Sequence, residues 1–223
     1  LSNITLNNAS ELVISDNRGN TSNAHAGKFR IDTCKNITIS NNVLSGIGIY
    51  SDTTMIINGN DLFCHNCGNN GIGVPNNWNW ASLVRVVDIY YSQDFSLSDN
   101  NYNALGGTMA DALRISNSSL GSIHHDTITL NTGNDSYWSP TSSWSRNPAA
   151  LAIGYSDNIN VHDNVLNGVY SPVAPGIFIR DSDSIYVKGN SIEGSSPYGI
   201  YLSNPMSLDL DSNIVKNFPN GIY

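Results

Sequence analysis

Glutamate and lysine are almost absent from this sequence, which has two glutamates and four lysines among its 223 residues. Both residue types favour helices, whereas the abundant asparagine, serine, glycine and aspartate favour turns and strands. The composition therefore argues against a largely helical protein and predicts an all-β chain. At this length we expect a single domain that covers residues 1–223.

Clustered positive charge is also missing. The formal net charge is −8, with ten Lys and Arg against eighteen Asp and Glu. Neutralising phosphate groups requires basic patches, so we expect no nucleic-acid partner. No apolar run approaches the roughly 18 residues that cross a bilayer, and the first residues lack a secretory signal. We therefore expect no membrane partner, and we expect any targeting segment to lie outside these residues.

Cysteine is scarce as well. Cys34, Cys64 and Cys67 are too few for a disulfide framework, and the one C-x-x-C pair is half of a typical zinc site. A loop disulfide and two free thiols are the alternatives for Cys64 and Cys67. The dense aspartate cluster that would support calcium binding is also missing. We therefore expect no cofactor and no metal.

The sequence does contain a regular repeat. Two apolar-x-apolar triplets, eight residues apart, precede an asparagine that lies 13 residues after the start of the first triplet. Period-two alternation predicts short strands with one buried face, which must stack coil on coil because a single coil cannot bury its own core. Eight coils follow this spacing: Ile4 to Asn17, Phe29 to Asn42, Ile47 to Asn60, Val87 to Asn100, Leu113 to Asp126, Leu151 to Asn164, Ile177 to Asn190 and Ile200 to Asn213.

The recurrent asparagine is expected at a tight turn, because its side chain tolerates left-handed backbone and can bond to turn amides. Stacked on one another, these side chains should form an internal ladder. Every first-triplet core position is apolar, and so is every second-triplet position except Gly121.

These coils, with an Asn-bearing short turn and variable third loops, resemble the pectate-lyase-like β-helix superfamily over nearly the whole chain. The resemblance implies a right-handed parallel β-helix of eight to nine coils, with substrate along the outer face of each first strand. The superfamily includes polysaccharide lyases, glycoside hydrolases, epimerases and phage tailspikes, so it does not define an activity. Residues 221–223 begin a ninth coil and no end cap is visible, so we expect a fragment or an internal domain.

Two connections, 63–84 and 129–148, are much longer than the others and flank the coils that start at Val87 and Leu113. Sugar rings stack on flat aromatic side chains, so we expect tryptophans on these loops to bind substrate; packing against the flank of the solenoid is the alternative. The two loops contain all four tryptophans of the chain: Trp78, Trp80, Trp138 and Trp144.

Charged residues are expected on the outer face of the same two coils. Strand alternation points Asp88 and Tyr90 outward from one coil and Arg114 outward from the next, with Asp88 and Arg114 in one column. Before each strand the signs invert, with Arg85 beside Asp111. We therefore predict a lattice of alternating charges, which could also be a purely structural set of salt bridges.

Two reactions are compatible with this lattice. A lyase would use Arg114 to abstract a proton beside a uronate carboxylate that Arg85 or Arg180 neutralises, and a hydrolase would use Asp88 and Asp111 as its acid/base pair. The catalytic candidates are thus Asp88, Asp111 and Arg114, and Arg85, Tyr90 and Arg180 are candidates for substrate binding. Further outward residues of the first strands would suit extended subsites: Arg30, Asp32, Tyr50, Phe178, Arg180 and Tyr201.

A histidine pair lies in another column. His124 and His162 precede ladder residues of adjacent coils, where two imidazoles could share a transition metal. A solvated pair is the alternative that we favour.

The combined pattern predicts a carbohydrate-active β-helix protein that binds and cleaves an extracellular polysaccharide, as a glycoside hydrolase or a polysaccharide lyase. The alternative is a non-catalytic β-helix that binds glycan or is purely structural. Examples are an adhesin or a virion-associated tailspike, which the resemblance would make a homotrimer.

Overall fold

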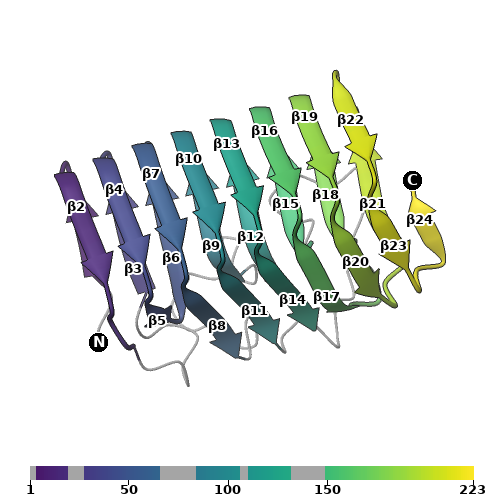
Figure 1. Cartoon of the computed structure of the whole chain (residues 1–223), viewed down its shortest axis with the longest axis horizontal. Helices are drawn as coiled ribbons and strands as arrows, with labels where there is room; N and C mark the ends of the chain where they lie inside the picture. The colour runs from purple at the N-terminus through teal and green to yellow at the C-terminus, as the bar shows by residue number, and fades with distance from the viewer. Residues whose placement is uncertain (1–3, 20–27, 66–83, 106–109, 132–148) are drawn as a thin grey trace, which may run out of the picture.

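The computed structural model describes residues 4–19, 28–65, 84–105, 110–131 and 149–223. Its strands form three sheets in which every pairing is parallel, and successive coils add one strand to each sheet. The predicted right-handed parallel β-helix is therefore confirmed. Figure 1 shows the coils stacked along one axis, with the two termini at opposite ends. Within the described ranges, no helix is long and apolar enough to cross a membrane.

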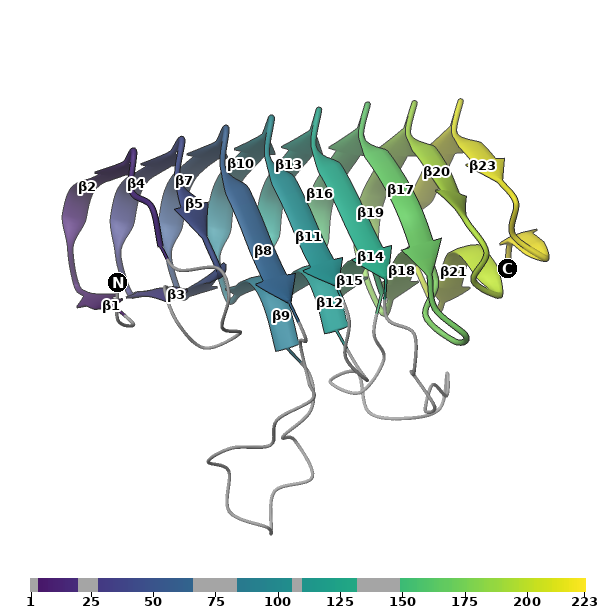
Figure 2. The same cartoon turned by 90° about the horizontal axis from the view of Figure 1, so that it is seen from below.

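The three sheets run the length of the stack, and Figure 2 shows them from a second side. Sheet A contains β1 (Ile4–Asn7), β3 (Lys28–Asp32), β6 (Gly46–Tyr50), β9 (Val84–Tyr90), β12 (Ala110–Ser116), β15 (Leu151–Gly154), β18 (Ile177–Arg180), β21 (Tyr198–Ser203) and β24 (Asn220–Ile222). Sheet B contains β2 (Ser10–Ser15), β4 (Lys35–Ser40), β7 (Thr53–Asn58), β10 (Gln93–Ser98), β13 (Ser119–His124), β16 (Asp157–His162), β19 (Asp183–Lys188) and β22 (Leu208–Asp211). Sheet C contains β5 (Val43–Leu44), β8 (Asp61–His65), β11 (Asn101–Leu105), β14 (Thr127–Asn131), β17 (Val165–Tyr170), β20 (Ser191–Gly194) and β23 (Ile214–Lys216).

The strand register follows the sequence columns. The first residues of the eight first triplets pair in one unbroken series through sheet A, from Ile4 opposite Phe29 to Ile177 opposite Ile200. The predicted start of a ninth coil is β24, which places Ile222 opposite Ile200. Because a one-residue slip would turn every core side chain outward, the apolar pattern is enough to fix this register.

Gly121, the one exception among the second-triplet positions, is explained by its neighbour. A Cβ atom on Gly121 would lie 2.2 Å from Cζ of Phe95, which is one coil away and 3% exposed. The Phe95 ring therefore fills the core volume of two coils, and glycine is the residue that leaves room for it.

Gly121→Val is expected to lower the free energy of unfolding by about 1–3 kcal/mol, because the added side chain must displace the Phe95 ring from a packed core. Urea unfolding would measure it, with Gly221→Ala as the control, since nothing lies within 4 Å of a Cβ at Gly221. Combined with Phe95→Ala, the substitution should cost less than the sum of the two single changes. Strict additivity would contradict this packing.

The predicted asparagine ladder is present inside the corner between sheets B and C. Each asparagine typically donates from Nδ2 to the Oδ1 atom of the next coil and to a backbone carbonyl of the previous coil, so the buried amides are paired. The side-chain bonds measure 2.9 to 3.0 Å and join Asn17 to Asn42, Asn42 to Asn60, Asn60 to Asn100, Asn164 to Asn190 and Asn190 to Asn213.

The backbone of this turn corrects one expectation. The ladder asparagines do not have positive φ; the residue before each one does, as at Asn41 (56°), Asp99 (57°) and Asp163 (56°). The ladder residue must point its side chain inward along the stack. The preceding, outward residue makes the left-handed turn.

A second ladder, which the sequence analysis did not predict, lies in the corner between sheets A and B. Here a backbone N–H donates to the side chain of the equivalent residue one coil on, as from Ser92 to Ser118 at 3.1 Å and from Ser156 to Ser182 at 3.2 Å. The signal in the sequence is a serine five residues after the start of a first triplet. The full series runs from Ala9 through Cys34, Asp52, Ser92, Ser118 and Ser156 to Ser182.

Candidate functional site

The outer face of sheet A carries the charged residues predicted from the sequence. In the register of β9 and β12, Arg114 lies opposite Asp88 and Asp111 lies opposite Arg85. Val86 and Val87 are consecutive and both fully buried, as are Ala112 and Leu113. Each pair interrupts the strict alternation of its strand, so residues three apart can share the outer face.

The four charges form a connected chain of ion pairs. Arg85 Nη1 lies 2.9 Å from Asp88 Oδ2, and its Nε lies 3.5 Å from Asp111 Oδ2. Arg114 Nε lies 2.6 Å from Asp111 Oδ2. The predicted lattice is therefore present, with Arg85 linking the two coils.

Burial divides this chain into an inner and an outer half. The side chains of Asp111 and Arg114 are 0% and 1% exposed, whereas those of Asp88 and Arg85 are 11% and 26% exposed. The backbone N–H of Ala149 donates to Asp111 Oδ1 at 2.9 Å and so occupies its second oxygen. Asp111 and Arg114 thus lie beneath the surface, and a ligand would meet Arg85 and Asp88 first.

The carboxylates beside Arg85 stabilise its positive charge. Burial alone would lower the pKa of its guanidinium, but the nearby carboxylates of Asp88 and Asp111 outweigh burial and raise the pKa above its usual value. Arg85 therefore stays cationic at neutral pH.

Tyrosine rings border the outer half on the side of β6. Tyr50 lies opposite Tyr90, with ring centroids 6.4 Å apart, and its hydroxyl donates to Asp88 Oδ2 at 3.4 Å. A Cβ atom on residue 48 would lie 2.9 Å from the Tyr50 ring. Glycine at this position therefore leaves space for that ring. Burial, and then the charge of Asp88, raise the pKa of Tyr50, which keeps its hydroxyl a donor.

Arginine and a further tyrosine extend this border. The guanidinium of Arg30 lies 4.6 Å from the centre of the Tyr50 ring, in a cation–π contact, and pairs with Asp32 at 3.1 Å. Tyr91, which the sequence analysis did not select, is 56% exposed and its ring centroid lies 4.1 Å from that of Tyr90. In the sequence, Tyr91 could have been identified as a bulky aromatic residue at a turn position. We name Arg30, Tyr50, Arg85, Asp88, Tyr90 and Tyr91 the sheet A cluster.

The other predicted binding residues are not brought into this cluster. Arg180 lies three coils from β9, roughly 14 Å at the usual strand spacing, and pairs with Asp181 at 2.9 Å. Near it, Tyr201 contacts Phe178 and Tyr198 with ring centroids 5.7 and 5.1 Å away. The predicted tryptophans Trp78, Trp80, Trp138 and Trp144 lie outside the described residues.

The histidine column is confirmed as a pair of neighbours. His124 lies opposite His162, and their rings stack with centroids 5.0 Å apart. His162 Nδ1 lies 3.0 Å from Asp163 Oδ2. Burial, followed by the positive charges that His162 and His125 can carry, lowers the pKa of His124. Among the described residues, no three His, Cys, Asp or Glu side chains are grouped to hold a metal ion.

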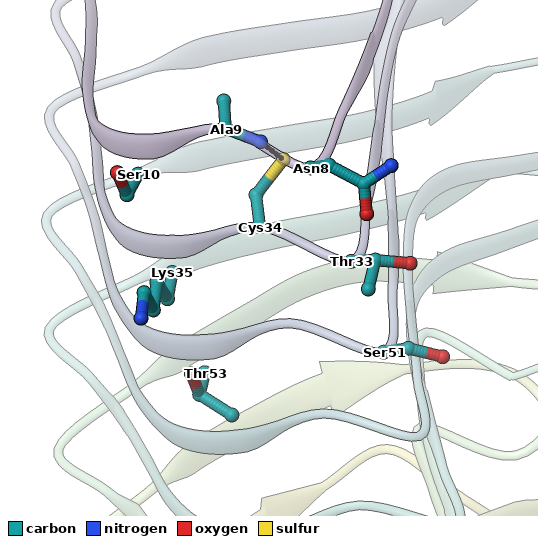
Figure 3. A pocket seen from close by; sticks show the side chains of 8 residues that line it. All are labelled: Asn8, Ala9, Ser10, Thr33, Cys34, Lys35, Ser51 and Thr53. Carbon is teal, nitrogen blue, oxygen red and sulfur yellow. Dashed lines mark hydrogen bonds between the residues drawn. The ribbon is translucent and has the colours of Figure 1, made fainter.

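A separate surface depression of about 400 Å³ lies at the corner between sheets A and B in the first three coils. Figure 3 shows the side chains that line it, with the N–H of Ala9 donating to the sulfur of Cys34. None of the predicted site residues lines this depression. The thiol of Cys34 is 2% exposed and belongs to the second ladder, so the depression follows from the turn geometry.

Comparison with known proteins gives one partial family match and gives little on activity. The model of the NosD family, described as a periplasmic copper-binding protein, matches residues 114–223, just under half of the chain. A search among curated proteins gives no match. Copper is part of that family's description, and the described residues of this chain show no group of three His, Cys, Asp or Glu side chains that could hold a metal ion.

The solved structures that match this chain share little sequence with it and have low TM-scores. The Streptococcus pneumoniae surface protein and adhesin PfbA is 12% identical, with a TM-score of 0.31, over 88% of this chain and 68% of that one. The Dettilon tailspike protein gp208 is 12% identical, with a TM-score of 0.33, over 99% of this chain. This chain spans 60% of the length of that tailspike chain. At such identities, the site must be argued from its own geometry.

Proposed function

We propose that this protein binds an oligosaccharide or polysaccharide on the outer face of sheet A, over the sheet A cluster. The observation that carries the proposal is the half-buried Arg85–Asp88 pair bordered by the rings of Tyr50 and Tyr90. Sugar hydroxyls both donate and accept hydrogen bonds, and a paired guanidinium and carboxylate supply both partners side by side. Aromatic faces next to such groups supply the apolar contact that pyranose rings need.

Binding outside the cytoplasm is part of this proposal, because the family whose model matches residues 114–223 is described as periplasmic. A stack of parallel strands also offers a long, regular surface, along which an extended polymer can contact several coils at once.

Tyr90→Ala is expected to weaken glycan binding roughly ten-fold, since one aromatic contact contributes about 1 kcal/mol or slightly more. Affinity electrophoresis against a panel of polysaccharides would measure it. The matched control is Tyr186→Ala, which removes a 47% exposed tyrosine from sheet B. Equal effects of the two substitutions, or binding that neither changes, would place the ligand elsewhere.

Cleavage of the bound glycan is the second candidate, favoured by the Asp88 carboxylate between Arg85 and the Tyr50 hydroxyl. In this proposal Asp88 acts on the substrate, and the buried Asp111 and Arg114 position Arg85. Incubation with the same panel would separate the reactions. New reducing ends alone indicate hydrolysis, and reducing ends with absorbance of unsaturated uronates indicate elimination. Binding without either signal would leave a binding protein.

A further inference from the structure

The arginines of sheet A share one property: each has an aspartate partner. Its strands contain four of the six arginines of the chain. Lys28, at the start of β3, is the only other cationic residue in these strands. The four pairs are Arg30 with Asp32 at 3.1 Å, Arg85 with Asp88 at 2.9 Å, Arg114 with Asp111 at 2.6 Å and Arg180 with Asp181 at 2.9 Å.

This pairing sets the electrostatic character of the proposed binding face. Four guanidinium and four carboxylate groups sum to zero formal charge, so the four pairs present local donors and acceptors without a net positive field. Lys28 is not among these pairs and belongs to β3, two coils from β9. The chain as a whole carries −8, which repels polyanions at distances up to about the Debye length. An acidic glycan would need a cation whose charge is not already met by a carboxylate.

We infer that the glycan bound on this face is neutral, recognised through its hydroxyl groups rather than through carboxylate or sulfate groups. The inference rests on the proposed function and names its ligand class. Asp88 is the residue that enforces the choice, because it is the more exposed of the two carboxylate partners of Arg85, and its Oδ2 already lies 2.9 Å from the Nη1 donor that a uronate carboxylate would need.

The test compares each neutral polysaccharide with a carboxylated counterpart, for example hydroxyethyl cellulose with carboxymethyl cellulose, and methyl-esterified with free polygalacturonan. The native chain is expected to bind a neutral member at least roughly ten-fold more tightly, with affinity nearly constant between low and high NaCl. Tighter binding of the acidic member, weakening as salt rises, would overturn the inference and leave the proposed function intact. No binding to any member would overturn the proposed function itself.

A charge variant makes the test independent of the choice of glycan. Asp88→Asn keeps the shape of the side chain and removes the charge that compensates Arg85, so the ratio of acidic to neutral affinity should rise roughly ten-fold. Asp209→Asn, on the outer side of sheet B, is the matched control and should leave the ratio unchanged. Thermal melting by circular dichroism checks that both variants are folded. An unchanged ratio in a folded Asp88→Asn protein would overturn the role of the pair.

Discussion

Replacing Asp126 by asparagine is expected to raise the free energy of unfolding at pH 8 by about 4 kcal/mol. Asp126 is the single acid in the asparagine ladder and is 1% exposed. Its Oδ1 accepts bonds from the backbone N–H and the Nδ2 of Asn100, at 2.7 and 3.0 Å, as an asparagine oxygen would. Its Oδ2 occupies the place of the donating Nδ2 group, which in the other coils bonds to an Oδ1 atom and a carbonyl oxygen.

Protonation resolves this conflict, because a neutral carboxyl group can donate. Burial, which outweighs the bonds from Asn100 and Tyr102, raises the pKa of Asp126 from 3.8 to about 7. Between these two values the unfolded chain loses the proton while the folded protein keeps it, so stability falls as pH rises from about 4 to about 7. Above pH 7 the full cost of a buried carboxylate is present.

The measurement is urea unfolding of the native and Asp126→Asn proteins at pH 4, 6 and 8. The difference in free energy should be below about 1 kcal/mol at pH 4 and should grow toward pH 8. Asp16→Asn is the control, since Asp16 is an exposed residue in the equivalent turn of the first coil, next to Asn17. A difference that is equal at all three pH values would contradict the assignment of this pKa.

Asp111→Ala is expected to lower the free energy of unfolding by about 3–5 kcal/mol, the usual cost of breaking a buried ion pair from one side. The substitution removes the carboxylate 2.6 Å from the Arg114 guanidinium and the acceptor of the Ala149 N–H. Both partners are buried, so water cannot replace the lost contacts. Urea unfolding at neutral pH measures the effect.

The control for Asp111 is Asp32→Ala, which breaks an exposed pair of the same two residue types in the same sheet. There the Arg30 side chain is 57% exposed, and a change below about 1 kcal/mol is expected. A double substitution, Asp111→Ala with Arg114→Met, should recover part of the loss because it removes the buried charge as well. Equal effects of the Asp111 and Asp32 changes would show that burial does not distinguish the two pairs.

Several parts of the fold could be predicted because they depend on local rules. The alternation of apolar residues determined which side chains point inward, and it fixed the register that places Ile4 opposite Phe29 and each later coil in turn. The recurrent asparagine marked the corner between sheets B and C. The serine ladder was missed because serine is common at any turn, and only the contact between Ser92 and Ser118 one coil on gives it a structural role.

The candidate site could be predicted in part. Alternation placed Asp88 and Arg114 in one outward column and Arg85 beside Asp111, and the structure has both pairings. Their solvent exposure could not be predicted. Asp111 is covered by an N–H from Ala149, 38 residues further along the chain. The catalytic roles first given to Asp88, Asp111 and Arg114 and the binding role of the tryptophans therefore remain predictions.

The sequence by itself determined the solenoid, its register and the column in which each outward residue lies, because strand alternation and turn chemistry act between residues close in the chain. The tertiary structure decided which charges are buried, that Arg85 also lies 3.5 Å from Asp111 on the next coil, and that burial raises the pKa of Asp126. These properties depend on contacts between coils, and hence on distances and solvent exclusion that no local pattern encodes.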